Sequence, residues 1–522
     1  MKVVSAQQMQ EIDRITIQQY GIPGEVLMAL AGKSVADYVL HTVKAHNVAV
    51  FCGVGNNGGD GFVAAYLLSQ YLPVDVFILG NTDKLTPSSR IYYDVCQHAS
   101  VRCCTISSET LATINLNSYD CIIDALTGTG FSGKPKGLLE QVINVINQSG
   151  KKVIAIDMPS GLPADGAVEF EPIVQAHTTI TMGLPKINAV TYPGKYYAGN
   201  VIVADIGFPY SLCTSGDICR QLIDEKFFTG NYRPNIHYDA HKGANGHLLC
   251  IGGFDGMEGA ILLCAKAAFA TGIGLVTIVT TQQARAIIAG KIPEAITRAL
   301  NATASEPFTK DMYGTVEFTN VYKDMLSQLE SIIQLARPTA CIIGPGLGRS
   351  VSSAATIAAC LKIAHTMQLP VLIDGDGLYC LAQLPEAKLP LHCVITPHFK
   401  EAERLTGMAV SDIKKNRLRS AEDMAQKLQC VTVLKGPASI VTSGTTTYIN
   451  TTGNPALATG GSGDVLSGII GALLSKGYDP LIAAALGVYI HGKAADIYCQ
   501  GSGSSMMQAG DIVRFVRNAL NC

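Results

Sequence analysis

The sequence GNPALATGGSGDVLSG, residues 453–468, is a glycine-rich loop that runs into a helix of small apolar residues. The first turn of a helix has free backbone N–H groups, and the helix dipole favours an anion there. Gly460, Gly461 and Gly463 would let the backbone approach a phosphate closely. A bare carboxylate would repel that phosphate, so we interpret Asp464 as a general base; the alternative is a plain helix N-cap.

This stretch resembles the signature of the ADP- or ATP-dependent NAD(P)H-hydrate dehydratases, a branch of the ribokinase-like fold. The resemblance implies that the Gly-Ser-Gly-Asp segment at 461–464 forms an anion hole and that Asp464 is the catalytic base. It also implies that Mg²⁺ and ADP are used at this site, although nothing in the residues separates ADP from ATP.

The surrounding C-terminal half alternates strand, glycine-rich turn and helix, a pattern typical of parallel βαβ units. Residues 301–330 are more polar, and we expect them to form an irregular surface segment. The expected strands are 248–251, 274–280, 339–343, 371–374, 394–396 and 431–434.

The resemblance implies two sets of contacts in this half. The residues implied to contact the hydrated substrate are Ala260, Gly346, His398 and Asp464. The residues implied to contact the nucleotide are Lys435, Gly436, Pro437, Ala438, Ser439 and Gly463. The pattern departs from the family at Lys400-Glu401, where Gly-Glu is usual. By itself His398 also fits a structural or capping histidine.

In the N-terminal half, the apolar strand 47–52 leads into GVGNNGGDG at residues 53–61. These glycines satisfy the GxGxxG dinucleotide pattern, but the next strand, 74–79, ends in Gly80-Asn81 without the acid that would hold a ribose. A standard dehydrogenase is therefore disfavoured. We predict a turn carrying three polar side chains there, followed by a helix from Phe62; simple turn chemistry is the alternative.

Two further apolar strands end in acids, Asp124 and Asp157. Residues 128–134 match most of a P-loop, but Pro135 stands where the Mg²⁺-binding hydroxyl should be, so we exclude an NTPase. Lys134 fits either a phosphate contact or a solvated loop lysine. Because the carboxyl ends of parallel strands line one crevice, the polar groups at these strand ends should meet there.

Residues 9–215 resemble the NAD(P)H-hydrate epimerase domain. The resemblance implies a potassium ion held by Asn57, Asp124 and Ser160, although their hard oxygens do not separate K⁺ from Na⁺ or Mg²⁺. The residues implied to bind the hydrate are Asn56, Asn57, Gly58, Gly59, Asp60, Gly128, Thr129, Gly130, Phe131, Ser132, Gly133, Lys134 and Asp157.

Composition narrows the class of protein. With 522 residues and a net charge of −2, the chain is long enough for several domains and lacks the basic excess of a nucleic-acid binder. We expect no signal peptide and no apolar run of about 18 residues, hence no membrane partner. The 16 cysteines are scattered without CxxC pairs and are interpreted as reduced thiols of a cytoplasmic protein, not as a metal cluster.

We therefore predict an α/β protein with two mainly parallel sheets flanked by helices, Rossmann-like in the N-terminal half and ribokinase-like in the C-terminal half. Residues 1–220 would epimerise hydrated NADH and NADPH, and residues 226–522 would dehydrate the S form with ADP, giving AMP and phosphate. We also expect a homo-oligomer. The alternative is a ribokinase-like small-molecule kinase fused to a dinucleotide-binding module.

Overall fold

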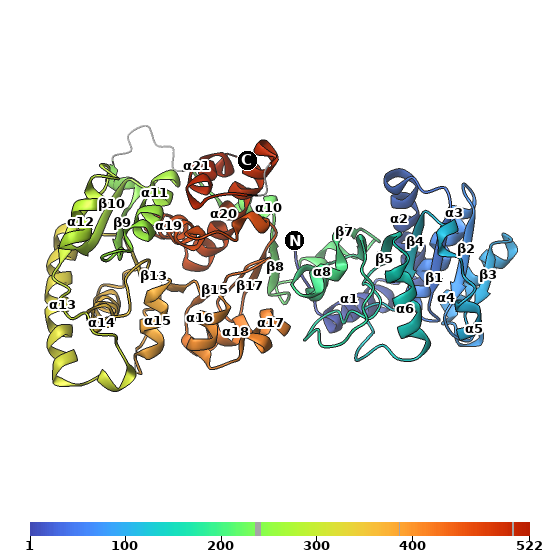
Figure 1. Cartoon of the computed structure of the whole chain (residues 1–522). Helices are drawn as coiled ribbons and strands as arrows, with labels where there is room; N and C mark the ends of the chain where they lie inside the picture. The colour runs from blue at the N-terminus through green and yellow to red at the C-terminus, as the bar shows by residue number, and fades with distance from the viewer. Residues whose placement is uncertain (235–241, 386, 504–505, 522) are drawn as a thin grey trace. The chain divides into compact units, whose positions relative to one another are not determined.

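The structure is a computed structural model that describes residues 1–234, 242–385, 387–503 and 506–521 (Figure 1). The chain divides into two compact units, Met1–Gln221 and Leu222–Cys522. Each unit is built around a sheet whose strands are mostly parallel, with helices in the connections. The predicted α/β class is confirmed.

The sheet of the first unit has seven strands in the order β3-β2-β1-β4-β5-β6-β7, and every pair is parallel. The order reverses direction between β1 and β4, which is the switch point of a Rossmann-like sheet, where ligands bind outside the carboxyl ends of the strands. The strands are β1 Val48–Cys52, β2 Val74–Ile78, β3 Arg102–Thr105, β4 Cys121–Ala125, β5 Lys152–Ile156, β6 Thr178–Met182 and β7 Asn200–Ala204.

The helices of the first unit connect these strands. They are α1 Ala6–Gln18, α2 Gly24–Tyr38, α3 Asn56–Ser69, α4 Pro87–His98, α5 Ser108–Leu111, α6 Leu138–Gln148, α7 Ile187–Val190, α8 Gly194–Ala198 and α9 Tyr210–Cys213. The expectation of a polar turn before a helix at Phe62 was wrong, because α3 already begins at Asn56. Asn56 and Asn57 therefore lie in its first turn, where backbone N–H groups are free, and Asp60 lies at the start of its second turn.

The expectation that no segment is long and apolar enough to cross a membrane also needs correction. Of the described residues, only the helical stretch Gly24–Val43 passes that test of length and composition. A core helix passes the same test, and the buried side chains of Leu27, Ala31 and Val35 belong to the hydrophobic core of the first unit.

The sheet of the second unit has ten strands in the order β11-β10-β9-β12-β13-β14-β15-β16-β17-β8. The strands from β11 to β15 are parallel, whereas β16 pairs antiparallel with β15 and β17. The switch point lies between β9 and β12. The strands are β8 Arg220–Ile223, β9 His247–Ile251, β10 Leu275–Thr281, β11 Ile296–Leu300, β12 Ala340–Ile343, β13 Val371–Ile373, β14 Cys393–Ile395, β15 Val431–Leu434, β16 Ile440–Thr442 and β17 Thr447–Asn450.

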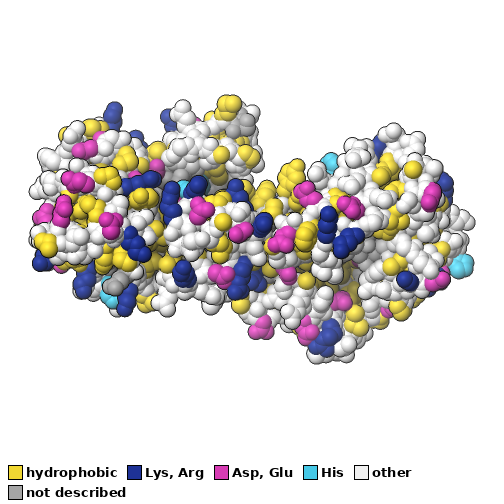
Figure 2. Space-filling model, turned by 60° about the horizontal axis from the view of Figure 1, so that its bottom comes forward, with side chains coloured by type: hydrophobic (Ala, Val, Ile, Leu, Met, Phe, Trp, Pro, Cys, Tyr) yellow, Lys and Arg dark blue, Asp and Glu magenta, His cyan; other side chains and the backbone are white. Residues whose placement is uncertain are grey.

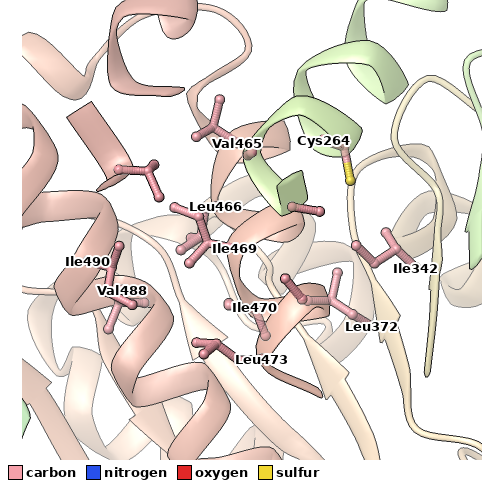
Figure 3. Packing of buried hydrophobic residues seen from close by; sticks show 14 of the residues in the cluster. Cys264, Ile342, Leu372, Val465, Leu466, Ile469, Ile470, Leu473, Val488 and Ile490 are labelled. Carbon is pink, nitrogen blue, oxygen red and sulfur yellow. The ribbon is translucent and has the colours of Figure 1, made fainter. Parts of the chain in front are cut away.

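Helix α19 is the central helix of the second unit. Its residues Val465, Leu466, Ile469 and Ile470 are buried and pack among side chains from α11, α20 and the sheet (Figure 3). A Cβ on Gly468 would lie 2.1 Å from the Cys264 carbonyl oxygen, so α11 and α19 pack closely only with glycine there. The helices of this unit are α10 Glu225–Asn231, α11 Glu258–Ala270, α12 Gln282–Ala289, α13 Val316–Ala336, α14 Val351–Met367, α15 Asp376–Gln383, α16 Phe399–Thr406, α17 Val410–Lys415, α18 Arg417–Leu428, α19 Ser462–Ser475, α20 Pro480–Ser502 and α21 Ala509–Leu520.

The expectation of an irregular segment over 301–330 was wrong for its second half, which begins α13, Val316–Ala336. Thr315 caps this helix by accepting the N–H of Phe318. The buried positions Phe318, Met325 and Leu329 follow helical spacing, so one face packs although the rest is polar.

Charged residues of both signs are interspersed on the face shown in Figure 2. This agrees with nearly equal totals of 39 Lys and Arg against 41 Asp and Glu. The cysteines that the structure describes are all free thiols, and most are buried.

Candidate functional sites

The first unit holds a cavity of about 630 Å³ at the carboxyl ends of its central strands. Residues from α3, from the loop after β4 and from the end of β5 line it together. The sequence-predicted residues that line this cavity are Asn56, Asn57, Asp60, Gly128, Thr129, Gly130, Phe131 and Asp157. The structure thus brings together side chains from three strand ends.

Five predicted hydrate-binding residues do not line the cavity. Gly58 and Gly59 are buried behind it, and a Cβ on Gly58 would lie 1.9 Å from the Gly53 carbonyl oxygen. Gly58 therefore allows α3 to pack against the turn after β1. Ser132, Gly133 and Lys134 are exposed on the loop after β4.

The proposed potassium ligands lie next to this cavity as a cluster of oxygens. Asp124 is fully buried, and its two oxygens accept the Ser160 hydroxyl at 2.5 Å and the Ser160 N–H at 2.8 Å. Burial raises the pKa of Asp124 to about 6. The amide nitrogen of Asn57 donates to the Thr127 carbonyl at 3.0 Å, and the Ser160 hydroxyl lies 3.4 Å from the same carbonyl oxygen.

Two residues in this cavity were missed by the sequence reasoning. Asp13 of α1 and Lys186 after β6 both line it, and Lys186 forms an ion pair with Asp157. The available signal was weak: Lys186 interrupts an apolar stretch, and Asp13 lies on the polar side of an amphipathic helix.

In the second unit, Asp464 lies in the first turn of α19, but it is not the N-cap. The N-cap is Gly461, at φ 87°, and no side chain caps the helix. The plain-cap alternative is therefore wrong. Burial, followed by repulsion from Asp374, raises the pKa of Asp464 to about 7, against the opposing attraction of Lys435. A carboxylate with such a pKa is matched to general-base work near neutral pH.

Lys435 follows β15 and points its ammonium at two carboxylates. Its Nζ lies 2.7 Å from Asp374 Oδ1 and 3.8 Å from Glu401 Oε2. Asp374 Oδ2 accepts the Ser467 hydroxyl at 2.8 Å. Burial alone would raise the pKa of Asp374, but Lys435 and the hydroxyl donors outweigh it and lower that pKa.

Gly463, in the first turn of α19, lies next to this ion pair. A Cβ on Gly463 would lie 3.4 Å from Lys435 Nζ and 3.8 Å from Asp374 Oδ2. Asp374 and Ser467 were given no role by the sequence, although an acid at the carboxyl end of β13 was a usable signal.

The residues implied to contact the hydrate fall into two groups. A Cβ on Gly346, which has φ 59°, would lie 3.1 Å from Ala260 Cβ, so these two positions are neighbours. His398 caps α16: its Nδ1 accepts the N–H groups of Lys400 at 3.0 Å and Glu401 at 3.3 Å. Glu401 in turn accepts the His398 N–H at 2.8 Å, so the capping box is complete with lysine at position 400.

The loop implied to contact the nucleotide, residues 435–439, has an unusual backbone. Gly436 has φ 149° and Ala438 has φ 48°, a left-handed conformation that side chains rarely adopt. The Arg417 guanidinium donates to the Pro437 carbonyl and, at 3.4 Å, to the Ala438 carbonyl. The Ser439 hydroxyl donates to the Gly436 carbonyl at 3.0 Å.

Comparison with known proteins covers both units. The family model "NAD(P)H-hydrate dehydratase" matches residues 248–517, and "YjeF-related protein N-terminus" matches residues 24–188. A crystal structure of the ADP/ATP-dependent NAD(P)H-hydrate dehydratase from Bacillus subtilis, co-crystallised with ATP/Mg²⁺, is 28% identical and covers 57% of this chain and 97% of that chain, with a TM-score of 0.47.

Full-length relatives match the whole chain. The bifunctional NAD(P)H-hydrate repair enzyme Nnr of Moorella thermoacetica is 36% identical over 99% of this chain and 96% of that protein. The enzyme of the same name from Thermofilum pendens is 33% identical over 100% of this chain and 96% of that protein. The chain belongs to the family of bifunctional NAD(P)H-hydrate repair enzymes.

Proposed function

We propose that this chain repairs hydrated NADH and NADPH in two steps. Residues 1–220 form the epimerase domain, which interconverts the R and S hydrates, and residues 226–522 form the dehydratase domain, which returns the S hydrate to NAD(P)H with ADP. The observation that carries this proposal is Asp464, a carboxylate with a pKa of about 7 beside the free N–H groups of α19 and the buried ammonium of Lys435.

The second site supplies what the dehydration needs, because hydroxide is a poor leaving group and phosphate is a good one. Asp464 takes the proton of the substrate hydroxyl, whose oxygen attacks the β-phosphorus of ADP, and AMP leaves. The N–H groups at the start of α19 bind the transferred phosphoryl group. The ring nitrogen then expels phosphate, and loss of a proton from the neighbouring ring carbon restores the double bond.

Mg²⁺ in this site would neutralise phosphate charge. In such sites Mg²⁺ usually takes most of its ligands from substrate phosphates and water, and only one or two from protein carboxylates. The described residues contain no group of three His, Cys, Asp or Glu side chains placed to hold a metal.

K⁺ fits the oxygens next to the first cavity. The buried Asp124 carboxylate pairs with the Ser160 hydroxyl and N–H and with no cation among the described residues. A monovalent cation held by Asn57, Asp124 and Ser160 would offset this buried charge and hold the ends of β1, β4 and β5 together.

The test is to incubate the chain with a mixture of R and S NADH hydrates, ADP and Mg²⁺, and to follow the return of NADH absorbance. We expect the whole mixture to be converted. Conversion of the S form alone would reject the epimerase assignment, and release of a stable phosphorylated product would favour the kinase alternative. ATP in place of ADP tests the choice of nucleotide.

The pKa of Asp464 makes dehydration depend on pH. The carboxylate can accept a proton only when it is ionised, so kcat/KM should fall about tenfold per pH unit below about 7. Measuring kcat/KM for the S hydrate from acidic to mildly alkaline pH checks this. A rate that stays flat down to the usual pKa of an exposed aspartate would contradict it.

Asp124→Asn should slow epimerisation by at least about tenfold, because the amide loses the negative charge that attracts the cation. Its NH2 group also cannot accept one of the two hydrogen bonds that the carboxylate oxygens take from Ser160. Epimerisation is measured with and without KCl, with NaCl at equal ionic strength as the reference. Dehydration in the same protein is the internal control. Equal loss of both activities would indicate unfolding or a shared site.

Three further features stay predictions. These are assembly into a homo-oligomer, a cytoplasmic location without membrane or nucleic-acid partners, and the preference for ADP over ATP. Mass measurement in solution addresses the first of them directly.

A further inference from the structure

The first cavity contains four charged side chains, of which the family resemblance assigns only Asp60 and Asp157, as contacts to the hydrate. Asp13, Asp60, Asp157 and Lys186 come from α1, α3, the end of β5 and the segment after β6, and all four line the same cavity. The cavity thus contains three acidic side chains and one lysine, and the lysine forms an ion pair with only one of the three acids, Asp157. None of the four is a proposed potassium ligand.

The ammonium group of Lys186 donates all of its hydrogen bonds to groups of the protein. Its side chain is 1% exposed, and its Nζ donates to the Asp157 carboxylate, to Thr181 Oγ1 at 3.1 Å and to the Met182 carbonyl at 2.9 Å. A protonated lysine has three N–H donors, and these three acceptors use all of them. Lys186 therefore has no proton left for a substrate.

Asp157 is held on one oxygen only. Its Oδ1 accepts Lys186, Thr181 Oγ1 at 3.3 Å and the Met182 N–H at 3.1 Å, and no described residue donates to Oδ2. Its backbone has φ 63°, a left-handed conformation that only the surrounding contacts can maintain. These hydrogen bonds fix the orientation of the carboxylate and leave its second oxygen for the cavity.

The surroundings of Asp60 disfavour a negative charge, in contrast to those of Asp157, which has Lys186 as its partner. Burial, followed by repulsion from Asp157 and from Asp13, raises the pKa of Asp60 well above its usual range, and the attraction of Lys186 only partly opposes this. The pKa of Asp13 is also raised, by burial first and by Asp157 second. Asp157 thus has a lysine as its direct partner, whereas Asp60 has none among the described residues and is repelled by two other acids. Two carboxyl groups in such different surroundings are typical of an acid and a base that act as a pair.

We propose that Lys186 is a positioning residue that divides the work of epimerisation between two catalytic carboxyl groups: it holds Asp157 in place as the proton acceptor and leaves Asp60 as the proton donor. This inference rests on the proposed epimerase function of the first unit.

The step balances without another reactant. Asp60 gives its proton to the hydroxyl on the hydrated ring carbon, the C–O bond breaks, and water leaves as the adjacent ring nitrogen forms a C=N bond. Water then adds to the other face of that carbon while Asp157 takes its proton. Transfer of this proton from Asp157 to Asp60 restores both groups, and nothing is oxidised or reduced.

The test uses the full chain and four variants: Lys186→Met, Asp157→Asn, the two combined, and Asp60→Asn. Epimerisation is measured on purified S hydrate, without nucleotide, as the appearance of the R form. We expect each single variant to lower kcat by about 10²-fold or more, the usual effect of losing an acid or base. Dehydration of the S form should keep its rate.

The combined variant separates positioning from a structural role. If Lys186 acts only through Asp157, then Lys186→Met should change kcat little once Asp157→Asn is present. A merely structural lysine would lower the rate again in that background. Lys195→Met is the matched control: this half-buried lysine donates to the Gly199 carbonyl at 2.9 Å and does not line the cavity, so epimerisation should stay unchanged.

Heavy-oxygen water gives a second readout. Every epimerisation through a broken C–O bond takes an oxygen from solvent. In the parent chain, label should therefore enter the hydrate at the rate of epimerisation. In the Asp60→Asn variant, this uptake of label should disappear. Epimerisation without label uptake would overturn the assignment of Asp60. A Lys186→Met variant that keeps more than about a tenth of the rate, under 1.4 kcal/mol in barrier, would overturn the role of Lys186. A parent chain that fails to epimerise would instead reject the proposed function itself.

Discussion

Asp464→Asn should lower the rate of dehydration by about 10²–10⁴-fold, the usual cost of removing a general base. The substitution keeps the size of the side chain and most of its hydrogen bonding but removes the proton acceptor from the first turn of α19. Binding of ADP should hold or strengthen, because a negative charge next to the phosphates is gone. The measurements are kcat for the S hydrate and the affinity for ADP.

The stability of this variant should change little. Asp464 is not the N-cap of α19, and its removal relieves repulsion with Asp374. Epimerisation in the first unit is the internal control. A variant that keeps more than about a tenth of its activity, a loss of under 1.4 kcal/mol in barrier, would remove Asp464 from the mechanism.

Lys435→Met should abolish dehydration and also destabilise the second unit by about 3–5 kcal/mol. Lys435 is the cation that lies 2.7 Å from Asp374 and 3.8 Å from Glu401, and the Asp374 side chain is only 4% exposed. Without the ammonium, a buried carboxylate must either stay charged without a partner or take up a proton. Thermal and denaturant unfolding of the second unit measure the loss.

A second substitution shows how much of the stability loss comes from the carboxylate that Lys435→Met leaves without a partner. Adding Asp374→Asn to Lys435→Met removes the stranded charge, so much of the stability should return while dehydration stays absent. Lys476→Met is the matched control, because this lysine donates only to the Thr271 carbonyl, at 2.7 Å, and its loss should cost about 1 kcal/mol. Equal stability loss in both lysine variants would contradict a special role for the Lys435 pair.

The positions of the polar groups at strand ends were predictable from local sequence. Asp124 and Asp157 each follow an apolar run, and parallel strands joined by helices place such residues at one edge of a sheet. The roles given to these residues, in contrast, came from family resemblance, and the hydrate, nucleotide and potassium contacts stay predictions.

Three expectations from the sequence were wrong, because the local residue types suggested one structure and packing in the folded unit produced another. Glycines and asparagines at residues 56–59 favour a turn, yet tight packing of Gly58 on Gly53 draws them into α3. The polar surface of α13 concealed its buried stripe. The long apolar stretch Gly24–Val43 was missed, and in the structure it packs into the core of the first unit.

The sequence by itself determined the two α/β units, the glycine-rich start of α19 and the presence of Asp464 in the first turn of that helix, because these follow from hydrophobic period and turn chemistry within short segments. Only the tertiary structure decided which charges meet. Asp374 and Lys435 are 61 residues apart, and Asp157 and Lys186 are 29 apart, yet each pair forms an ion pair in the folded chain, part-buried in the first case and buried in the second. The protonation of a carboxyl group depends on burial and on charges within a few ångströms, and folding brings those from distant parts of the chain.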